Sequence, residues 1–238
     1  DLLEDLNCPF YKVASFEMTD IPLIKKIAST KKTMIISTGM ATFKEIKKTY
    51  EVALNNGASE IILLYCVSNY PAQRSDFNLN NIKILKREFN CKVGFSDHSK
   101  DDQIAKAAVY AGAEVIEKHI ALENQKKGLD VKFSLKGKEL LKFRNSLNES
   151  YDLLGKKFFY RNKSENKSKI FRRSVFAVQD IKKGEKFSLE NIRRIRPGYG
   201  LSPIYYDKLI NKKSPYEIKK ASPIREDILK KLKIKVIN

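Results

Sequence analysis

Five short apolar segments alternate with segments of helical spacing through the first 155 residues of the chain. The apolar segments are rich in Val, Ile, Tyr and Phe and have the length of strands, over residues 11–17, 33–39, 60–67, 92–97 and 114–120. Between and after them, apolar residues recur at the spacing of one helix face, over 21–30, 43–57, 79–89, 102–113 and 138–155. Strands that alternate regularly with helices pair in parallel, so this pattern predicts an α/β fold with five βα units.

The pattern changes after residue 155. Gly155 is a suitable residue to end the last predicted helix. Residues 156–170 are polar and basic, have no periodicity and are predicted to be a linker. Residues 171–238 are rich in short β-type segments and turn residues, which predicts a small second domain.

The formal net charge of +19 has two interpretations. A strongly basic protein can bind nucleic acid, and such a protein would show affinity for DNA or RNA that falls steeply with salt. Here most of the excess is lysine spread through every predicted helix, and no stripe of aromatic and basic side chains is present. We therefore expect no nucleic-acid partner, and interpret the charge as a compositional preference that also attracts an anionic substrate.

Cysteine usage and hydropathy indicate a cellular location. The three cysteines, Cys8, Cys66 and Cys91, form no CxxC pair, and their odd number argues against a disulfide framework. No apolar run has the length needed to span a bilayer, and the acidic first residues do not resemble a signal peptide. We expect a cytoplasmic protein with no membrane partner.

Polar side chains follow each predicted strand at its carboxyl end. In parallel α/β folds these ends meet on one side of the sheet and build the active site. A single serine at such a place is usually a turn residue or a helix N-cap, but the recurrence in five successive units favours a site. The residues concerned are Ser15, Glu17, Ser37, Ser68, Tyr70, Ser96, Asp97, His98, Lys118 and His119.

The only two histidines of the chain occupy matching places in successive units. His98 is the next-to-last residue of the segment KVGFSDHS, and His119 is the next-to-last residue of EVIEKHI. Neutral imidazole is a common ligand of transition-metal ions, and the two rings would converge if their strands are neighbours. The alternative is two unrelated histidines in turns.

Six motifs occur in the order and roughly the spacing of a known family: KVASFE, ISTGMA, SNYP, GFSDHS, GAEVIEKHI and RPGYG. With them the chain resembles, over essentially its whole length, the sialic acid synthase family of phosphoenolpyruvate-dependent nonulosonate synthases. The resemblance implies a (β/α)₈ TIM barrel, of which 1–155 would supply the last five βα units, and a SAF (antifreeze-like) domain over 171–238. Family members are usually longer at the amino terminus, so this chain would be a fragment or a truncated gene product. Five barrel strands alone would leave two unpaired sheet edges.

The resemblance also implies a mechanism and a set of ligands. Lys12, Ser15, Ser37 and Ser96 would bind phosphoenolpyruvate, because a phosphate and a carboxylate need cations and hydroxyl donors. His98 and His119 would hold a divalent ion, Mn²⁺ or Mg²⁺, that acts as a Lewis acid on the aldehyde of an open-chain amino sugar.

Three further residues are candidates for catalysis. Glu17 is the first choice for proton handling and could equally orient a sugar hydroxyl. Asp97 would orient the imidazole of His98 or cap the next helix. Lys118 would pair with the phosphate or with Glu117.

Other positions match sugar contacts of the family. Tyr70 and Asp130 match directly, whereas Ser68 replaces the usual asparagine. Tyr65 stands where many relatives have histidine. Arg196 of RPGYG matches an arginine that reaches into the partner subunit's site, which implies a domain-swapped homodimer; the alternative for Arg196 is a turn-stabilising role.

The segment after the second histidine helps to indicate which sugar is the substrate. Phe133 in KFSL resembles pseudaminic acid synthases and would suit a methyl group of a deoxy sugar such as 2,4-diacetamido-2,4,6-trideoxy-L-altrose. One methyl separates substrates by only about 1–3 kcal/mol. An N-acetylneuraminate or legionaminate synthase is therefore an alternative, as is an inactive remnant whose C-terminal domain binds a partner or carbohydrate.

Overall fold

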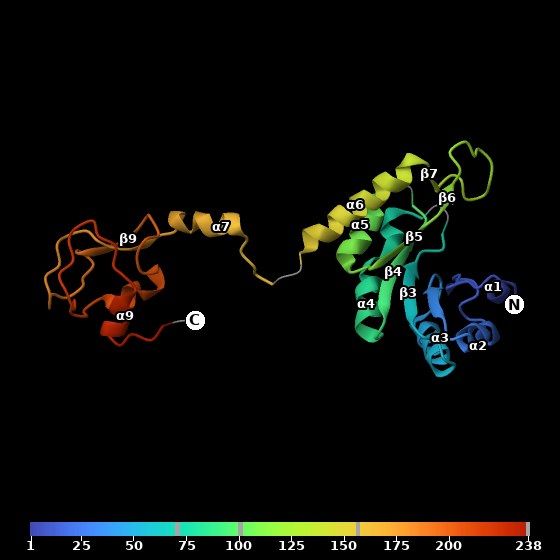
Figure 1. Cartoon of the computed structure of the whole chain (residues 1–238), viewed down its shortest axis with the longest axis horizontal. Coiled ribbons are helices and arrows are strands. Elements are labelled where there is room, and N and C mark those ends of the chain that lie inside the picture. The colour runs from blue at the N-terminus through green and yellow to red at the C-terminus, as the bar shows by residue number, and fades with distance from the viewer. Residues whose placement is uncertain (70–71, 100–101, 156–157, 237–238) are drawn as a thin grey trace. The chain divides into compact units, whose positions relative to one another are not determined.

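The structure is a computed structural model that describes residues 1–69, 72–99, 102–155 and 158–236 (Figure 1). The chain forms two compact units, Asp1–Lys156 and Lys157–Asn238. Each unit has a separate buried core and is described by itself.

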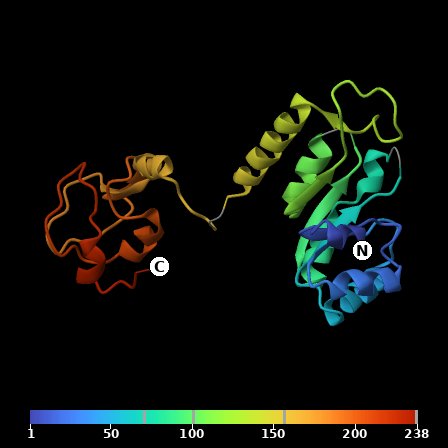
Figure 2. The same cartoon turned by 45° about the vertical axis from the view of Figure 1, so that its right-hand side comes forward.

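Unit 1 is built on a parallel five-stranded sheet. Its strands are β1 (Phe10–Val13), β2 (Thr33–Ser37), β3 (Ile61–Cys66), β4 (Lys92–Asp97) and β5 (Val115–Lys118), and they pair in chain order. The intervening helices are α2 (Ile21–Ser29), α3 (Phe43–Asn55), α4 (Asn80–Glu88) and α5 (Asp102–Ala111), with a 3₁₀ turn at Arg74–Phe77. Because parallel crossovers are right-handed and the strands follow chain order, the helices cover one side of the sheet (Figures 1 and 2). This arrangement is half of a (β/α)₈ barrel and confirms the predicted fold class.

Local signals in the sequence set the ends of the helices. Thr42 and Glu45 form a capping box at the start of α3, and the Asp20 side chain caps α2. Helix α6 (Lys138–Leu154) ends at Gly155, which has a φ of +66°. A left-handed residue at this place favours glycine, so the predicted end of the helix is confirmed.

The sheet has two open edges among the described residues, since β1 pairs only with β2 and β5 only with β4. The central strand β3 is almost wholly buried, whereas all four residues of β5 are partly exposed. Helix α6 packs on α5 and borders a largely apolar groove of about 780 Å³ beside β5. The first residues form helix α1 (Leu2–Asp5). A parallel pair of β6 (Ile120–Ala121) with β7 (Leu135–Lys136) was not predicted.

Unit 2 has an antiparallel pair, β8 (Ser174–Ala177) with β9 (Ile192–Ile195), and short helices over Pro203–Tyr205, α8 (Tyr206–Leu209) and α9 (Asp227–Lys231). Its core includes Ile181, Phe187 and Leu201. The residues predicted to be a linker include α7 (Lys163–Lys167) and a 3₁₀ turn at Ser168–Phe171. Helix α7 forms because Asn162 and Glu165 make a capping box, a local signal that the loss of periodicity obscured.

Within the described residues, no helix combines the length and the hydropathy that crossing a bilayer requires.

Candidate functional site

The pairing register of β4 with β5 positions the polar residues at their ends. Ser96 lies opposite Glu117, and its Oγ donates to Glu117 Oε1 at 2.6 Å. Asp97 lies opposite Lys118, and Lys118 Nζ is 2.9 Å from Asp97 Oδ2. Successive side chains of a strand point to opposite faces, so these two pairs lie on opposite faces of the sheet.

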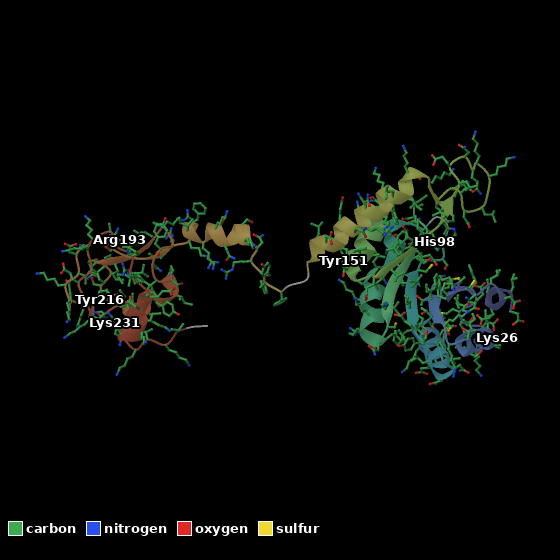
Figure 3. All side chains as sticks on the ribbon, viewed as in Figure 1. Lys26, His98, Tyr151, Arg193, Tyr216 and Lys231 are labelled. Carbon is green, nitrogen blue, oxygen red and sulfur yellow. The ribbon has the colours of Figure 1, made fainter. Side chains whose placement is uncertain are left out.

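The two histidines come one residue after these strand ends. Their ring centroids are 5.1 Å apart, so the predicted convergence of His98 and His119 is present in the structure. Phe133 packs edge-on against both rings, with centroid distances of 6.0 Å to His98 and 5.2 Å to His119. Figure 3 labels His98 near the end of the sheet from which β6 and β7 project.

The surroundings of His98 favour its neutral form. Burial lowers the pKa of His98, and the neighbouring His119 lowers it further. The Cys66 Sγ atom lies 3.8 Å from His98 Nδ1, and Asp130 Oδ2 lies 3.4 Å from His119 Nδ1. Neutral imidazole is the form that binds metal ions, so this environment suits a ligand.

The rings border a cavity of about 430 Å³ at the carboxyl ends of the strands. Seven residues predicted from the sequence line it: Lys12, Ser15, Ser37, Ser96, His98, Lys118 and His119. The lining also includes Phe16, Cys66 and Glu117, which had no predicted role as site residues. The cavity thus brings together cations, hydroxyls, a carboxylate and two imidazoles.

Ser37 has an unusual place in this cavity. Its side chain is buried, and within the described part of the chain its Oγ atom has no hydrogen-bond partner. An unpaired buried hydroxyl costs roughly 1–3 kcal/mol, and such groups are rare. Because this hydroxyl borders the cavity, a bound polar ligand would supply the missing partner.

Gly39 allows the side chains of Ser15 and Ser68 to approach its backbone closely. Its amide donates to Ser15 Oγ at 3.0 Å, and a methyl group at Gly39 would overlap the hydroxyl of Ser68. Ser68 is also 3.8 Å from Cys66 Sγ. A glycine here therefore keeps the Ser15 and Ser68 hydroxyls together.

The charges of the site form two pairs. Lys12 Nζ lies 3.3 Å from Glu117 Oε2. Lys118 and Asp97 are almost fully buried, with side-chain exposures of 7% and 0%. The expected alternative of a Lys118–Glu117 pair is not what forms, because adjacent residues of β5 point to opposite faces. The other Asp97 oxygen accepts from the amide of Ser99 at 2.8 Å, and Lys118 Nζ also contacts the carbonyl of Ser99.

The remaining predicted residues are more scattered. Glu17 is exposed in the turn after β1 and is not among the residues that line the cavity. Asp130 is exposed beside His119. Arg196 belongs to unit 2, and Tyr70 lies outside the described residues.

Glu117 is the main residue that sequence reasoning did not assign to the site. The signal was present, since Glu117 and His119 are two residues apart and therefore share one face of an extended segment. Ser96 and His98 have the same relationship in the preceding unit.

Several known proteins are similar to this chain in sequence and in fold. The NeuB family matches residues 1–158, and the SAF domain matches residues 172–230. The chain is 38% identical to the pseudaminic acid synthase of Campylobacter jejuni, over 91% of this chain and 63% of that protein. It is 39% identical to the N,N'-diacetyllegionaminic acid synthase of the same organism, over 95% of this chain and 69% of that protein. The chain thus spans about two thirds of the length of these relatives.

A solved structure extends the likeness to the fold. The crystal structure of a Chromobacterium violaceum protein named for spore coat polysaccharide biosynthesis matches with a TM-score of 0.81 and 26% identity. The match covers 96% of this chain and 69% of that one. The family match over all of unit 1, the similarity to two synthases and the six sequence motifs agree. This chain belongs to the NeuB family, the sialic acid synthase family that its motifs resemble, and carries a SAF domain.

Proposed function

We propose that this protein condenses phosphoenolpyruvate with an open-chain N-acetylated amino sugar, giving a nine-carbon keto sugar acid and phosphate. The observation that carries the proposal is the convergence of His98 and His119 on a cavity lined by cations and by the unpaired buried hydroxyl of Ser37. A phosphate-bearing enol needs such donors at one end, and an aldehyde needs an electrophilic partner at the other.

Phosphoenolpyruvate would bind at the Lys12 side of the cavity. Lys12 supplies a positive charge, and Ser15 and Ser37 supply hydroxyl donors. Ser96 would donate to the ligand only by giving up its hydrogen bond to Glu117. Lys118 balances the buried charge of Asp97 and would add to the positive potential at the phosphate. The enol carbon then attacks the sugar aldehyde carbon, water adds to the second carbon of the former enol, and the tetrahedral intermediate expels phosphate.

The residues present fit a divalent ion, Mn²⁺ or Mg²⁺. Two imidazoles converge, and burial favours the neutral form of His98. Among the described residues no group of three or more His, Cys, Asp and Glu side chains is arranged to hold a metal, so His98 and His119 would be its protein ligands here. When bound, the ion supplies Lewis-acid polarisation of the aldehyde. Phe133 would shield the outer side of the imidazole pair from water.

A carboxylate is needed to move protons at the new alcohol and at the attacking water. Glu17 was the first choice from the sequence, but it lies outside the lining of the cavity. Glu117 lies inside it, where Ser96 and Lys12 hold its two oxygens. We therefore assign the proton-handling role to Glu117 ahead of Glu17. Asp97 would keep Lys118 charged and in place.

For the sugar, we favour 2,4-diacetamido-2,4,6-trideoxy-L-altrose, the substrate of pseudaminic acid synthases. Support comes from Phe133 beside the imidazole pair and from the serine at Ser68. The legionaminic alternative has equal support from overall similarity. Asp130 near His119, Ser68 and Tyr70 would contact the sugar, and Arg196 would do so across a domain-swapped homodimer.

Phosphate release from phosphoenolpyruvate tests this function. The chain, and a version extended to the length of its relatives, would each be given Mn²⁺ and one of three sugars: N-acetylmannosamine or the diacetamido trideoxy derivatives of mannose or altrose. The proposal expects release that requires both sugar and metal, fastest with the altrose derivative, and none with His119→Ala. Fastest release with another sugar would reassign the substrate.

The competing hypothesis is an inactive remnant that acts as a binding module. It expects no phosphate release in either version, and no rise in melting temperature with Mn²⁺ and phosphoenolpyruvate. That combined result would overturn the proposed function.

A further inference from the structure

Unit 2 contains a groove of about 750 Å³ with a concentration of positive charge. Among the described residues that line it, the cations are Arg161, Lys169, Arg172, Arg173 and Arg196, and Glu226 is the only carboxylate. The ionisable side chains of this groove therefore carry a net charge of +4. All of them lie within unit 2.

The cations of this groove are mostly arginine rather than lysine. The chain has 37 lysines and only ten arginines, yet this groove has four arginines and one lysine. The excess lysine of the protein therefore does not explain the groove. Arginine presents a rigid planar fork of donors that matches phosphate and carboxylate oxygens, which lysine cannot do.

The backbone that carries these cations is held by buried contacts. Ser174 is buried, and its Oγ donates to the carbonyl of Pro197 at 2.7 Å and accepts from the amide of Gly200 at 2.9 Å. The amide of Gly198 donates to the carbonyl of Ile170 at 2.8 Å. A side chain at Gly198 would clash with the carbonyl of Lys169, so glycine lets the two segments meet. The loop after β9 and the turn before β8 are thus fixed against each other.

The arginines of the groove are exposed. In the described part of the chain, no ion pair joins Arg161, Arg172 or Arg173 to an acidic side chain. Like charges gathered on a fixed backbone repel one another, and an anion bound among them removes that repulsion.

We propose that this groove of unit 2 binds a small ligand that bears a phosphate or carboxylate group. Its volume is in the range of small-molecule sites, roughly 300–1,000 Å³. Of the described residues that line it, Phe171 is the only aromatic one, which disfavours single-stranded nucleic acid because successive bases stack on successive aromatic rings. This inference does not depend on the reaction proposed for unit 1.

The test is a titration of the full chain with inorganic phosphate, and in parallel with acetate, at constant ionic strength maintained with chloride. Amide NMR signals of Gly198, Gly200 and Ser202 report on the groove. We expect saturable shifts of these signals with one or both anions, and the anion that binds more tightly identifies the group that is recognised. Arg172→Gln/Arg173→Gln should weaken binding by roughly tenfold or more, because the double substitution removes two charged hydrogen-bond donors from the groove.

Two further variants separate a built site from general charge. Lys182→Gln/Lys183→Gln removes the same charge from exposed lysines of unit 2 outside the groove, and should leave affinity unchanged. Arg172→Lys/Arg173→Lys keeps the charge and should still weaken binding. Shifts that do not saturate, or equal weakening in the groove and control variants, would overturn the proposal. So would binding of a single-stranded oligonucleotide that neither anion competes away.

Discussion

His98 and His119 follow the ends of the adjacent parallel strands β4 and β5, and their ring centroids are 5.1 Å apart. The register that pairs Ser96 with Glu117 places the next residues of each face, the two histidines, side by side. At this distance two imidazolium charges would repel, which agrees with the lowered pKa of His98. This placement of the two imidazole rings suits the binding of one metal ion by both histidines.

Removing either imidazole should abolish specific binding of Mn²⁺ while the fold is retained. His98→Ala and His119→Ala each leave one protein ligand, and the chain has no other histidine to replace it. Electron paramagnetic resonance of free Mn²⁺ during a titration measures the loss, and circular dichroism checks the fold. Cys66→Ser is the control, because its thiol lies beside His98 without a proposed ligand role. Equal loss in the control would make Cys66 a ligand and the two-imidazole site wrong.

Ser37→Ala should have opposite effects on stability and on binding. Removing a buried hydroxyl that lacks a partner should raise the free energy of unfolding by about 1 kcal/mol. The same change should reduce the thermal stabilisation that phosphoenolpyruvate produces. Ser96→Ala is the matched control: its hydroxyl has a partner in Glu117, so stability should fall by about 1 kcal/mol. Calorimetry gives both quantities, and a loss of stability in Ser37→Ala would contradict the account.

The buried pair of Lys118 and Asp97 should be costly to break from one side. Asp97→Leu alone or Lys118→Met alone leaves an uncompensated buried charge, with an expected cost of about 3–5 kcal/mol each. The double variant should cost much less than the sum of the two. Urea unfolding of all four proteins completes the double-mutant cycle. Additive costs would show that the two groups do not interact.

Alkaline pH should destabilise unit 1 through Cys91. Burial raises the pKa of its thiol to about 11 from an ordinary value of 9.0. The folded state therefore holds this proton more tightly than the unfolded state. The stability that the protonated Cys91 thiol contributes is complete below pH 9 and is lost as the pH rises toward 11. Tyrosines titrate in the same range, so the measurement is the difference between the protein and Cys91→Ala in urea unfolding at pH 8, 9.5 and 11. A constant difference would refute the assignment.

Most of the fold could be predicted from the sequence, but less of the candidate site could. All five strands and the helices between them were predictable, because burial on both faces of β3 and capping residues such as Thr42 leave local signals. The convergence of the histidines followed from strand order alone. The partner of Lys118 did not, because it depends on the register that places Asp97 opposite it. The groove of unit 2 was not predicted, because only the fold brings Arg161 and Arg172 to Arg196.

The most direct test of the central claim is anomalous X-ray scattering from crystals of the chain soaked with Mn²⁺ and phosphoenolpyruvate. The account predicts an anomalous peak within bonding distance of a ring nitrogen of both His98 and His119, with the phosphate near Lys12 and Ser37. A manganese peak elsewhere, or phosphoenolpyruvate bound away from the Ser37 hydroxyl, would contradict it.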